Sequence, residues 1–308
     1  MDMKRTIRQM AAIITLAAAA VPAYSGSARA LDSRALVEVE LLADRDRLAA
    51  GEKFRLGLLF RISPGCHIYW MNPGDAGLAP EIEWKLPEGF SAGPLFWPAP
   101  QRMEEPGGLL VNVYTGEVML FCWVQPPERI ESSGVTLKAD ARWLVCRKIC
   151  VQGSAGAALE LKVSPAPSGS PVNEDIFSRY AARVPRPAAD LSALRSQARW
   201  IGNKNERAEA RTGLIMLEST AEKSMWLTGE REFFWFGYPS ESLTSGEIHY
   251  DPSHSSAARL ALHLLVRKPD DISDWPAGWG GILTARLVKA EADTVDYAVS
   301  LDFTGQDE

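Results

Sequence analysis

The chain contains four cysteines, and two of them stand close together in the segment Trp143-Leu-Val-Cys-Arg-Lys-Ile-Cys150. On a straight strand the Cα atoms of Cys146 and Cys150 would lie about 13 Å apart, at about 3.3 Å per residue. A disulfide requires Cα atoms within about 7 Å of each other. Residues 147–149 must therefore form a turn or a helical kink if this pair is to close.

The residues between these two sulfurs favour reactivity. Arg147 and Lys148 are cations beside Cys146 and Cys150, and nearby cations favour the thiolate, which is the better leaving group in disulfide exchange. The same spacing is also typical of an ordinary small disulfide in a hairpin. The residues alone leave both interpretations open.

The other two cysteines, Cys66 and Cys122, lie in apolar, strand-like stretches. A bond between them would close a long loop and contribute about 4 kcal/mol, against about 2 kcal/mol for the short loop of Cys146 and Cys150. We expect either a structural Cys66–Cys122 disulfide or two buried thiols, because such surroundings disfavour reaction.

The first 30 residues are typical of a secretory signal peptide. Basic residues precede an apolar run at 10–21, and small residues lead to Ala28-Arg29-Ala30, which predicts cleavage after Ala30. No later stretch offers the roughly 20 apolar residues that a membrane-spanning helix needs. The mature chain is therefore expected to be soluble, periplasmic and not inserted in the membrane.

The charge of the chain argues against polyanionic partners. The net charge is −6, and removing residues 1–30, with four basic side chains and one acidic one, makes it more negative. Nucleic acid and anionic membrane surfaces are poor partners for such a protein.

The elements that must position the cysteines are predicted to be short strands. Polar and apolar residues alternate between turn-forming Gly and Pro residues, which favours antiparallel sandwiches over βαβ units. In the first half the expected strands cover residues 54–62, 117–124, 135–143 and 157–163, and in the second half residues 213–217, 232–236, 260–266 and 283–288.

A Pro- and Ser-rich stretch at 164–171 separates the two halves, and its composition is typical of a linker. Residues 173–183 then carry a polar cap, early acids and a late Arg, which predicts one short helix. The expected organisation is a signal peptide at 1–30, a first domain at 31–163, a linker with a short helix at 164–189 and a second β-sandwich at 190–308.

Several separated motifs resemble one family. They are Gly65-Cys-His-Ile-Tyr-Trp-Met-Asn-Pro-Gly-Asp-Ala-Gly77, Ile82-Glu-Trp-Lys-Leu-Pro-Glu-Gly89, Trp97-Pro98 and the segment from Trp143 to Cys150. In this order they resemble the N-terminal periplasmic domain of DsbD-type thiol:disulfide interchange proteins, most closely the ScsB branch linked to copper tolerance. The second half resembles the additional immunoglobulin-like domain of that branch.

The resemblance implies two immunoglobulin-like β-sandwiches and a thiol–disulfide relay, that is, a protein-disulfide reductase without a cofactor or bound metal. The catalytic residues would be Cys146, which resolves, and Cys150, which joins the partner. Arg147, Lys148, Trp143 and Tyr114 would support them, with Tyr114 in a cap loop at about 101–116. The implied partners are a membrane-embedded thiol redox protein, expected to be a separate chain, and disulfide-bearing periplasmic proteins.

Two other functions compete with this interpretation. Cu(I) favours soft ligands, and the candidates here are Cys146, Cys150, Cys66, His67, Met71, Met103 and Met119. Methionines in strands more often belong to the core. The other alternative is a redox-inert adaptor built from two sandwiches, which a titration of free thiols would distinguish from an exchange protein.

Overall fold

The computed structural model describes residues 36–164, 170–187, 190, 194–201, 210–219, 231–239, 247–253, 255, 259–267, 278–287 and 297–304. In these residues the chain is nearly all β, with strands throughout and one helix. The predicted signal peptide and cleavage site, and residues 165–169 of the linker, lie outside the described residues. None of the described helical segments has the length and apolarity to span a bilayer.

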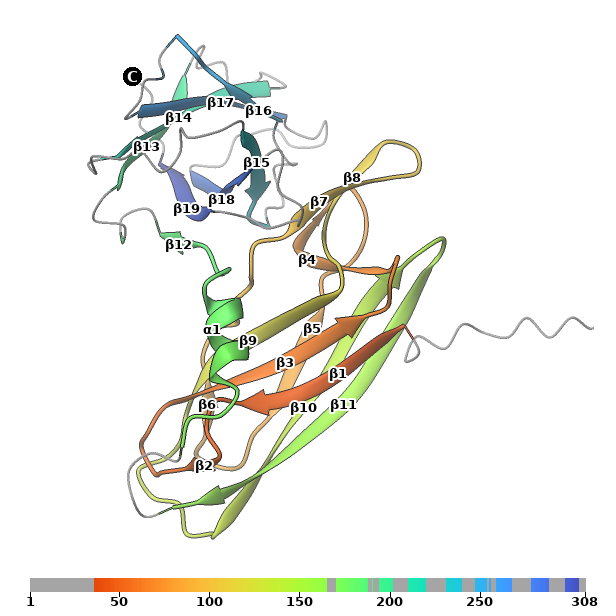
Figure 1. Ribbon diagram of the computed structural model, residues 1–308, viewed down its shortest axis with the longest axis vertical. Coiled ribbons are helices and arrows are strands. Elements are labelled where there is room, and N and C mark those ends of the chain that lie inside the picture. The colour runs from red at the N-terminus through yellow and green to blue at the C-terminus, as the bar shows by residue number, and fades with distance from the viewer. Residues whose placement is uncertain are drawn as a thin grey trace, which may run out of the picture. The chain divides into compact units, whose positions relative to one another are not determined.

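The first part of the chain contains eleven of the described strands, and they form two sheets (Figure 1). One sheet has the order β1-β3-β9-β6, and the other has the order β2-β11-β10-β4-β8-β7, with β5 also paired to β10. The bounds are β1 Val37–Ala43, β2 Arg47–Leu48, β3 Phe54–Ile62, β4 His67–Gly74, β5 Glu81–Lys85, β6 Ser91–Ala92, β7 Gln101–Glu105, β8 Leu109–Tyr114, β9 Glu117–Gln125, β10 Gly134–Cys146 and β11 Cys150–Val163.

Both sheets contribute apolar side chains to one core. Along β10 the inward residues Val135, Leu137, Ala139, Ala141, Trp143 and Val145 are buried, and the residues between them up to Arg142 are exposed. This is the period of two that a strand with one buried face requires. Strand β3, buried at almost every position, faces this core from the other sheet.

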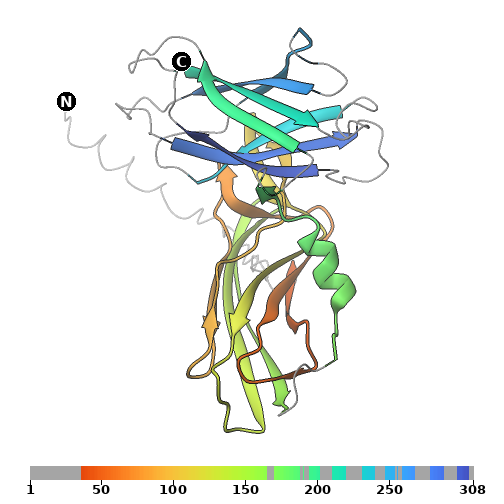
Figure 2. The same cartoon turned by 90° about the vertical axis from the view of Figure 1, so that its left-hand side faces the viewer.

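Strands β10 and β11 form a long antiparallel hairpin, whose register runs from Gly134 opposite Lys162 to Cys146 opposite Cys150. Figures 1 and 2 show its two arms side by side along their whole length. The loop at its tip consists of residues 147–149, where the Arg147 N–H donates to the Ile149 carbonyl at 3.3 Å. Regular pairing down both arms therefore brings the two cysteines opposite each other.

Trp143 fixes this hairpin to the core. Its ring meets Phe60 of β3 edge to face, with centroids 5.7 Å apart. Across the hairpin it stands opposite Gly153, where any Cβ would collide with the indole ring. The glycine thus leaves room for a large buried aromatic side chain on the same strand as Cys146, three residues before it.

Helix α1, Glu174–Ala181, confirms the short helix expected at 173–183. Phe177 and Tyr180 form its buried face; Phe177 packs edge-on against Phe121, and the Tyr180 hydroxyl donates to Glu117 at 2.8 Å. The Arg55 guanidinium links Asp44 at 2.8 Å to Glu174 at 3.1 Å. These contacts hold the helix beside the sheet that contains β1 and β3 (Figure 2).

The remaining strands form two further four-stranded sheets with the orders β12-β19-β18-β15 and β13-β14-β17-β16. A second apolar core lies among them, and alternate residues of one strand, from Leu260 to Val266, are buried in it. The bounds are β12 Arg186–Pro187, β13 Leu194–Ile201, β14 Ala210–Ser219, β15 Arg231–Gly237, β16 Glu247–Tyr250, β17 Arg259–Arg267, β18 Gly278–Leu287 and β19 Tyr297–Thr304.

Candidate functional site

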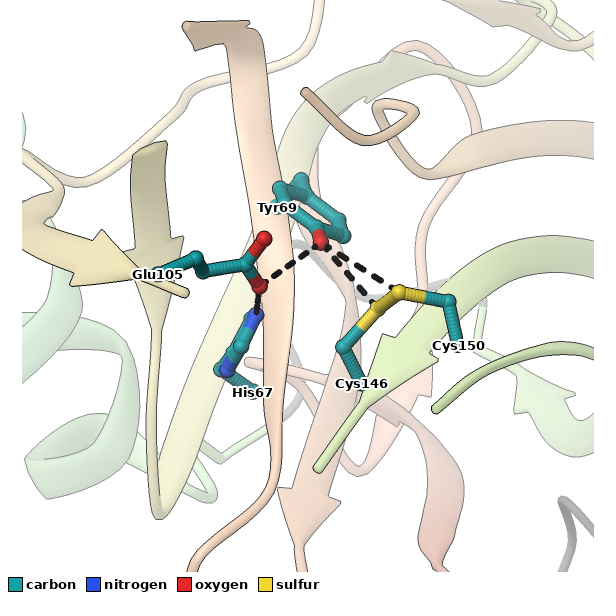
Figure 3. The surroundings of a disulfide bond; sticks show 5 residues. All are labelled: His67, Tyr69, Glu105, Cys146 and Cys150. Atoms are coloured by element: carbon teal, nitrogen blue, oxygen red, sulfur yellow. Dashed lines mark hydrogen bonds and ion pairs between the residues drawn. A yellow bond between two sulfur atoms is a disulfide. The ribbon is translucent and has the colours of Figure 1, made fainter. Parts of the chain in front are cut away.

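A disulfide joins Cys146 and Cys150 at the tip of the β10–β11 hairpin, with their Cα atoms 4.1 Å apart (Figure 3). The expected turn at 147–149 is therefore present. The two cysteines differ in exposure: Cys146 is 3% exposed, whereas Cys150, the first residue of β11, is exposed. Cys150 is therefore the more accessible of the two cysteines.

Cys146 points to the face of the sheet opposite the main core. On β10 the inward residue is Val145, so its neighbour Cys146 must face outward. Here the outer face is covered, because Cys146 packs in a small cluster with Tyr69, Val111 and Val113. The hairpin of β7 and β8 brings this cover, and it explains why a residue on an outer face is buried.

Tyr69 lies directly against the disulfide. Its hydroxyl is 3.1 Å from Cys146 Sγ, 3.8 Å from Cys150 Sγ and 3.3 Å from Glu105 Oε1 (Figure 3). Burial, and secondarily the Glu105 carboxylate, raises the pKa of Tyr69 to about 12. The phenol therefore keeps its proton at neutral pH and can donate it in a hydrogen bond to sulfur.

His67 and Glu105 form a second pair beside the sulfurs. His67 stands opposite Cys146 in the β4–β10 register, and its Nε2 lies 2.9 Å from Glu105 Oε1. Burial lowers the pKa of His67, although the nearby Glu105 carboxylate opposes that shift. Since burial is the larger effect, the imidazole is neutral at neutral pH.

Glu105 reaches this place because β7 ends in a tight turn. The next residues are Pro106, Gly107 and Gly108, and both glycines have positive φ, 95° and 79°. The Gly108 N–H donates to the Glu105 carbonyl at 3.1 Å. Glycine adopts such a left-handed backbone without a steric penalty, so the Pro-Gly-Gly sequence lets the chain reverse immediately after the carboxylate.

The structure places the predicted supporting residues in two environments. Arg147 and Lys148 are exposed in the loop between the cysteines. Trp143 lies on β10 of the same hairpin, and its side chain is buried. Tyr114, expected in the cap, is buried in the main core, where its hydroxyl donates to the Pro98 carbonyl at 2.6 Å. The tyrosine that contacts the disulfide is Tyr69.

The structure does not form the second disulfide for which Cys66 and Cys122 were candidates, because both are free and buried. Their side chains belong to the main core. Cys122 lies on β9 opposite Leu56, whereas Cys66 immediately precedes β4 in the other sheet. Burial raises the pKa of the Cys122 thiol to about 12, which makes it a poor nucleophile.

Sequence reasoning named His67 only as a soft metal ligand and missed Tyr69 and Glu105. One signal was present, because His67 and Tyr69 are two residues apart and so share a strand face. That face is opposite to the one with Cys66, Ile68 and Trp70, which lie in the main core.

Residues 38–160 match the family model described as thiol:disulfide interchange protein DsbD, N-terminal. The N-terminal periplasmic domain of ScsB from Proteus mirabilis has a similar fold, with a TM-score of 0.55 and 18% identity over 87% of this chain and 93% of that one. The reduced DsbD N-terminal domain of Neisseria meningitidis aligns over 43% of this chain and 90% of that one, with a TM-score of 0.26 and 14% identity. Curated protein sequences include no match to this chain. Residues 38–160, which contain the disulfide and its surroundings, therefore match the N-terminal domain of DsbD-type thiol:disulfide interchange proteins.

Proposed function

We propose that this chain is a periplasmic thiol–disulfide exchange protein. It relays reducing equivalents through Cys146 and Cys150, from a membrane-embedded thiol redox protein to disulfide-bearing periplasmic proteins. The observation that carries the proposal is the asymmetric disulfide: Cys150 is exposed beside the loop, and Cys146 is buried against a phenol that can donate to its sulfur. Its position in a DsbD N-terminal domain supports the same function.

When the oxidised protein is reduced, a thiolate of the reducing partner attacks Cys150 Sγ. A bond forms between the partner's sulfur and Cys150 Sγ while the Cys146–Cys150 bond breaks, and Cys146 leaves as a thiolate. The Tyr69 hydroxyl is 3.1 Å from that sulfur and stabilises the new charge. A second thiol of the partner then releases Cys150, so two electrons have reached the pair.

When the protein acts on a substrate, the reduced Cys150 attacks the substrate disulfide and one substrate sulfur leaves as a thiolate. Cys146 then attacks Cys150 Sγ in the mixed disulfide, which frees the second substrate thiol and closes the pair again. The buried cysteine suits this resolving role, because no competing partner reaches it. Arg147 and Lys148 add a modest, solvent-screened attraction for thiolates.

Trp143 positions the reactive loop without touching the reacting atoms. Its contact with Phe60 and its fit against Gly153 hold β10 and β11 in the register that sets Cys146 opposite Cys150. The two sulfurs therefore stay aligned for ring closure after each exchange.

Replacing Tyr69 with Phe should slow the opening of the disulfide by dithiothreitol about tenfold. The Cys146 thiolate would lose a charge-assisted hydrogen bond, which contributes about 1.5–3 kcal/mol. The measurement is the rate at which alkylation after an acid quench labels Cys146 and Cys150. Tyr114→Phe is the matched control, because it removes a hydroxyl bonded to Pro98 and should leave the rate unchanged.

Equal rates for Tyr69→Phe and the parent protein would contradict the role given to the phenol. A parent disulfide that stays closed until the protein unfolds would contradict the exchange function itself.

We also propose that the chain is exported and built from two domains. The motifs at 1–30 support a signal peptide with cleavage after Ala30, and the fold shared with the periplasmic domain of Proteus mirabilis ScsB supports the compartment. One apolar cluster is made mostly of residues 37–161, together with Phe177, Tyr180, Phe236 and Ile282, and a second consists of residues 200–301. The second cluster supports a sandwich at 190–308, beside one at 31–163 and a linker at 164–189.

A further inference from the structure

The His67 imidazole has an unsatisfied nitrogen. The residue is 5% exposed, and its Nε2 has no partner with hydrogen-bond geometry among the residues that the structure describes. Glu105 Oε1 lies 2.9 Å away, as an ion-pair contact. A buried nitrogen left in this way costs free energy and calls for an explanation.

This nitrogen points into a group of potential metal ligands. His67, Glu105 and Cys146 each offer one ligand atom, and these atoms lie within 4.8 Å of one another. They come from β4, β7 and β10, strands of a single sheet, so the sheet register fixes their spacing. Cys150 Sγ, which is bonded to Cys146 Sγ, could supply a fourth ligand once the disulfide is reduced (Figure 3).

The redox state of the sulfurs decides whether such a site exists. In the disulfide neither sulfur carries the charge that a metal ligand needs. Reduction adds two electrons and two protons to give two thiols, and each thiol that binds a metal releases its proton. In a zinc site such a sulfur, nitrogen and oxygen lie about 2.0–2.3 Å from one ion.

The donor set identifies the metal class. A thiolate is soft, an imidazole is intermediate and a carboxylate is hard, and Zn²⁺ accepts all three in tetrahedral sites. Cu(I) would favour sulfur and leave the carboxylate unused.

We propose that the reduced protein binds one Zn²⁺ ion through Cys146, Cys150, His67 and Glu105. A bound ion occupies both sulfurs, so it prevents them from attacking a disulfide until the metal is removed. This site extends beyond the exchange function and does not depend on it, because metal binding requires only that the pair be reduced.

The experiment titrates the full chain with Zn²⁺ in competition with a chromophoric chelator under anaerobic conditions, before and after reduction with a phosphine. We expect one ion per reduced chain and none per oxidised chain. His67→Ala should weaken the affinity at least about tenfold. His249→Ala is the matched control, since His249 also faces a glutamate, at 3.7 Å, but is exposed; its affinity should equal that of the parent.

Equal zinc binding by the oxidised and reduced chains, or equal affinities for His67→Ala and His249→Ala, would overturn the site. If circular dichroism shows that His67→Ala is unfolded, the isosteric variant Glu105→Gln is titrated instead. A tenfold loss of zinc affinity in this variant would support the site, and an unchanged affinity would contradict it. Zinc binding without thiol exchange would contradict only the proposed function. Exchange by the metal-free protein without zinc binding would contradict only this site.

Discussion

A reduced Cys146→Ala variant should form one stable mixed disulfide per chain with glutathione disulfide, whereas a reduced Cys150→Ala variant should form none. Cys150 is exposed and can attack, and without Cys146 no second sulfur resolves the adduct. In Cys150→Ala the remaining thiol is only 3% exposed. Intact-protein mass spectrometry counts the adducts, and peptide mapping locates them.

The double variant Cys146→Ala/Cys150→Ala is the control for the two free cysteines. Cys66 and Cys122 are buried in the core, so this variant should form no adduct and should remain folded. An adduct in the double variant would show that a core thiol reacts. Equally fast adducts in both single variants would contradict the division of roles between Cys146 and Cys150.

Phe60→Ala should lower the free energy of unfolding by about 3–5 kcal/mol. The Phe60 side chain is fully buried and meets the Trp143 ring edge to face, so its removal leaves a cavity between β3 and the reactive hairpin. Urea unfolding followed by far-ultraviolet circular dichroism measures the change. Leu78→Ala, at a residue that is 57% exposed, should change stability by no more than about 0.5 kcal/mol.

A loss below about 1 kcal/mol for Phe60→Ala would show that the contact with Trp143 does not hold the hairpin to the core. The assignment of Trp143 as a positioning residue would then be wrong.

The strands around the site could largely be predicted from hydrophobic alternation. The stretch at 54–62 coincides with β3, Phe54–Ile62, and the stretch at 135–143 lies within β10, Gly134–Cys146. Alternation is a local signal, and it is strong where one face is buried. Alternation failed to show that β10 and β11 continue to the cysteines, because exposed residues and glycines weaken the pattern near the tip of the hairpin.

The surroundings of the disulfide could not be predicted, because they depend on which strands pair. Glu105 lies on β7 and reaches Tyr69 and His67 on β4 across the intervening strand β8. Nothing in the local sequence of Glu105 indicates this neighbour. The same limit applies to Tyr114, which the resemblance to the family placed in the cap at about 101–116, although its ring packs in the core.

The two remaining cysteines illustrate a different limit. Loop entropy indicates how much a bond between Cys66 and Cys122 would stabilise the fold, but it says nothing about whether their sulfurs meet. That depends on the packing of two sheets, and the structure leaves both thiols free. Of the two alternatives that the sequence left open, buried thiols are the one observed.

The reduction potential of the Cys146–Cys150 pair tests the central claim most directly. The full chain is equilibrated in dithiothreitol or glutathione redox buffers, and the fraction of reduced pair is read by alkylation and mass spectrometry. A relay protein must exchange electrons with other thiol proteins, so we expect a potential between about −120 and −270 mV. A potential below about −300 mV is typical of structural disulfides and would contradict the claim that this pair exchanges thiols.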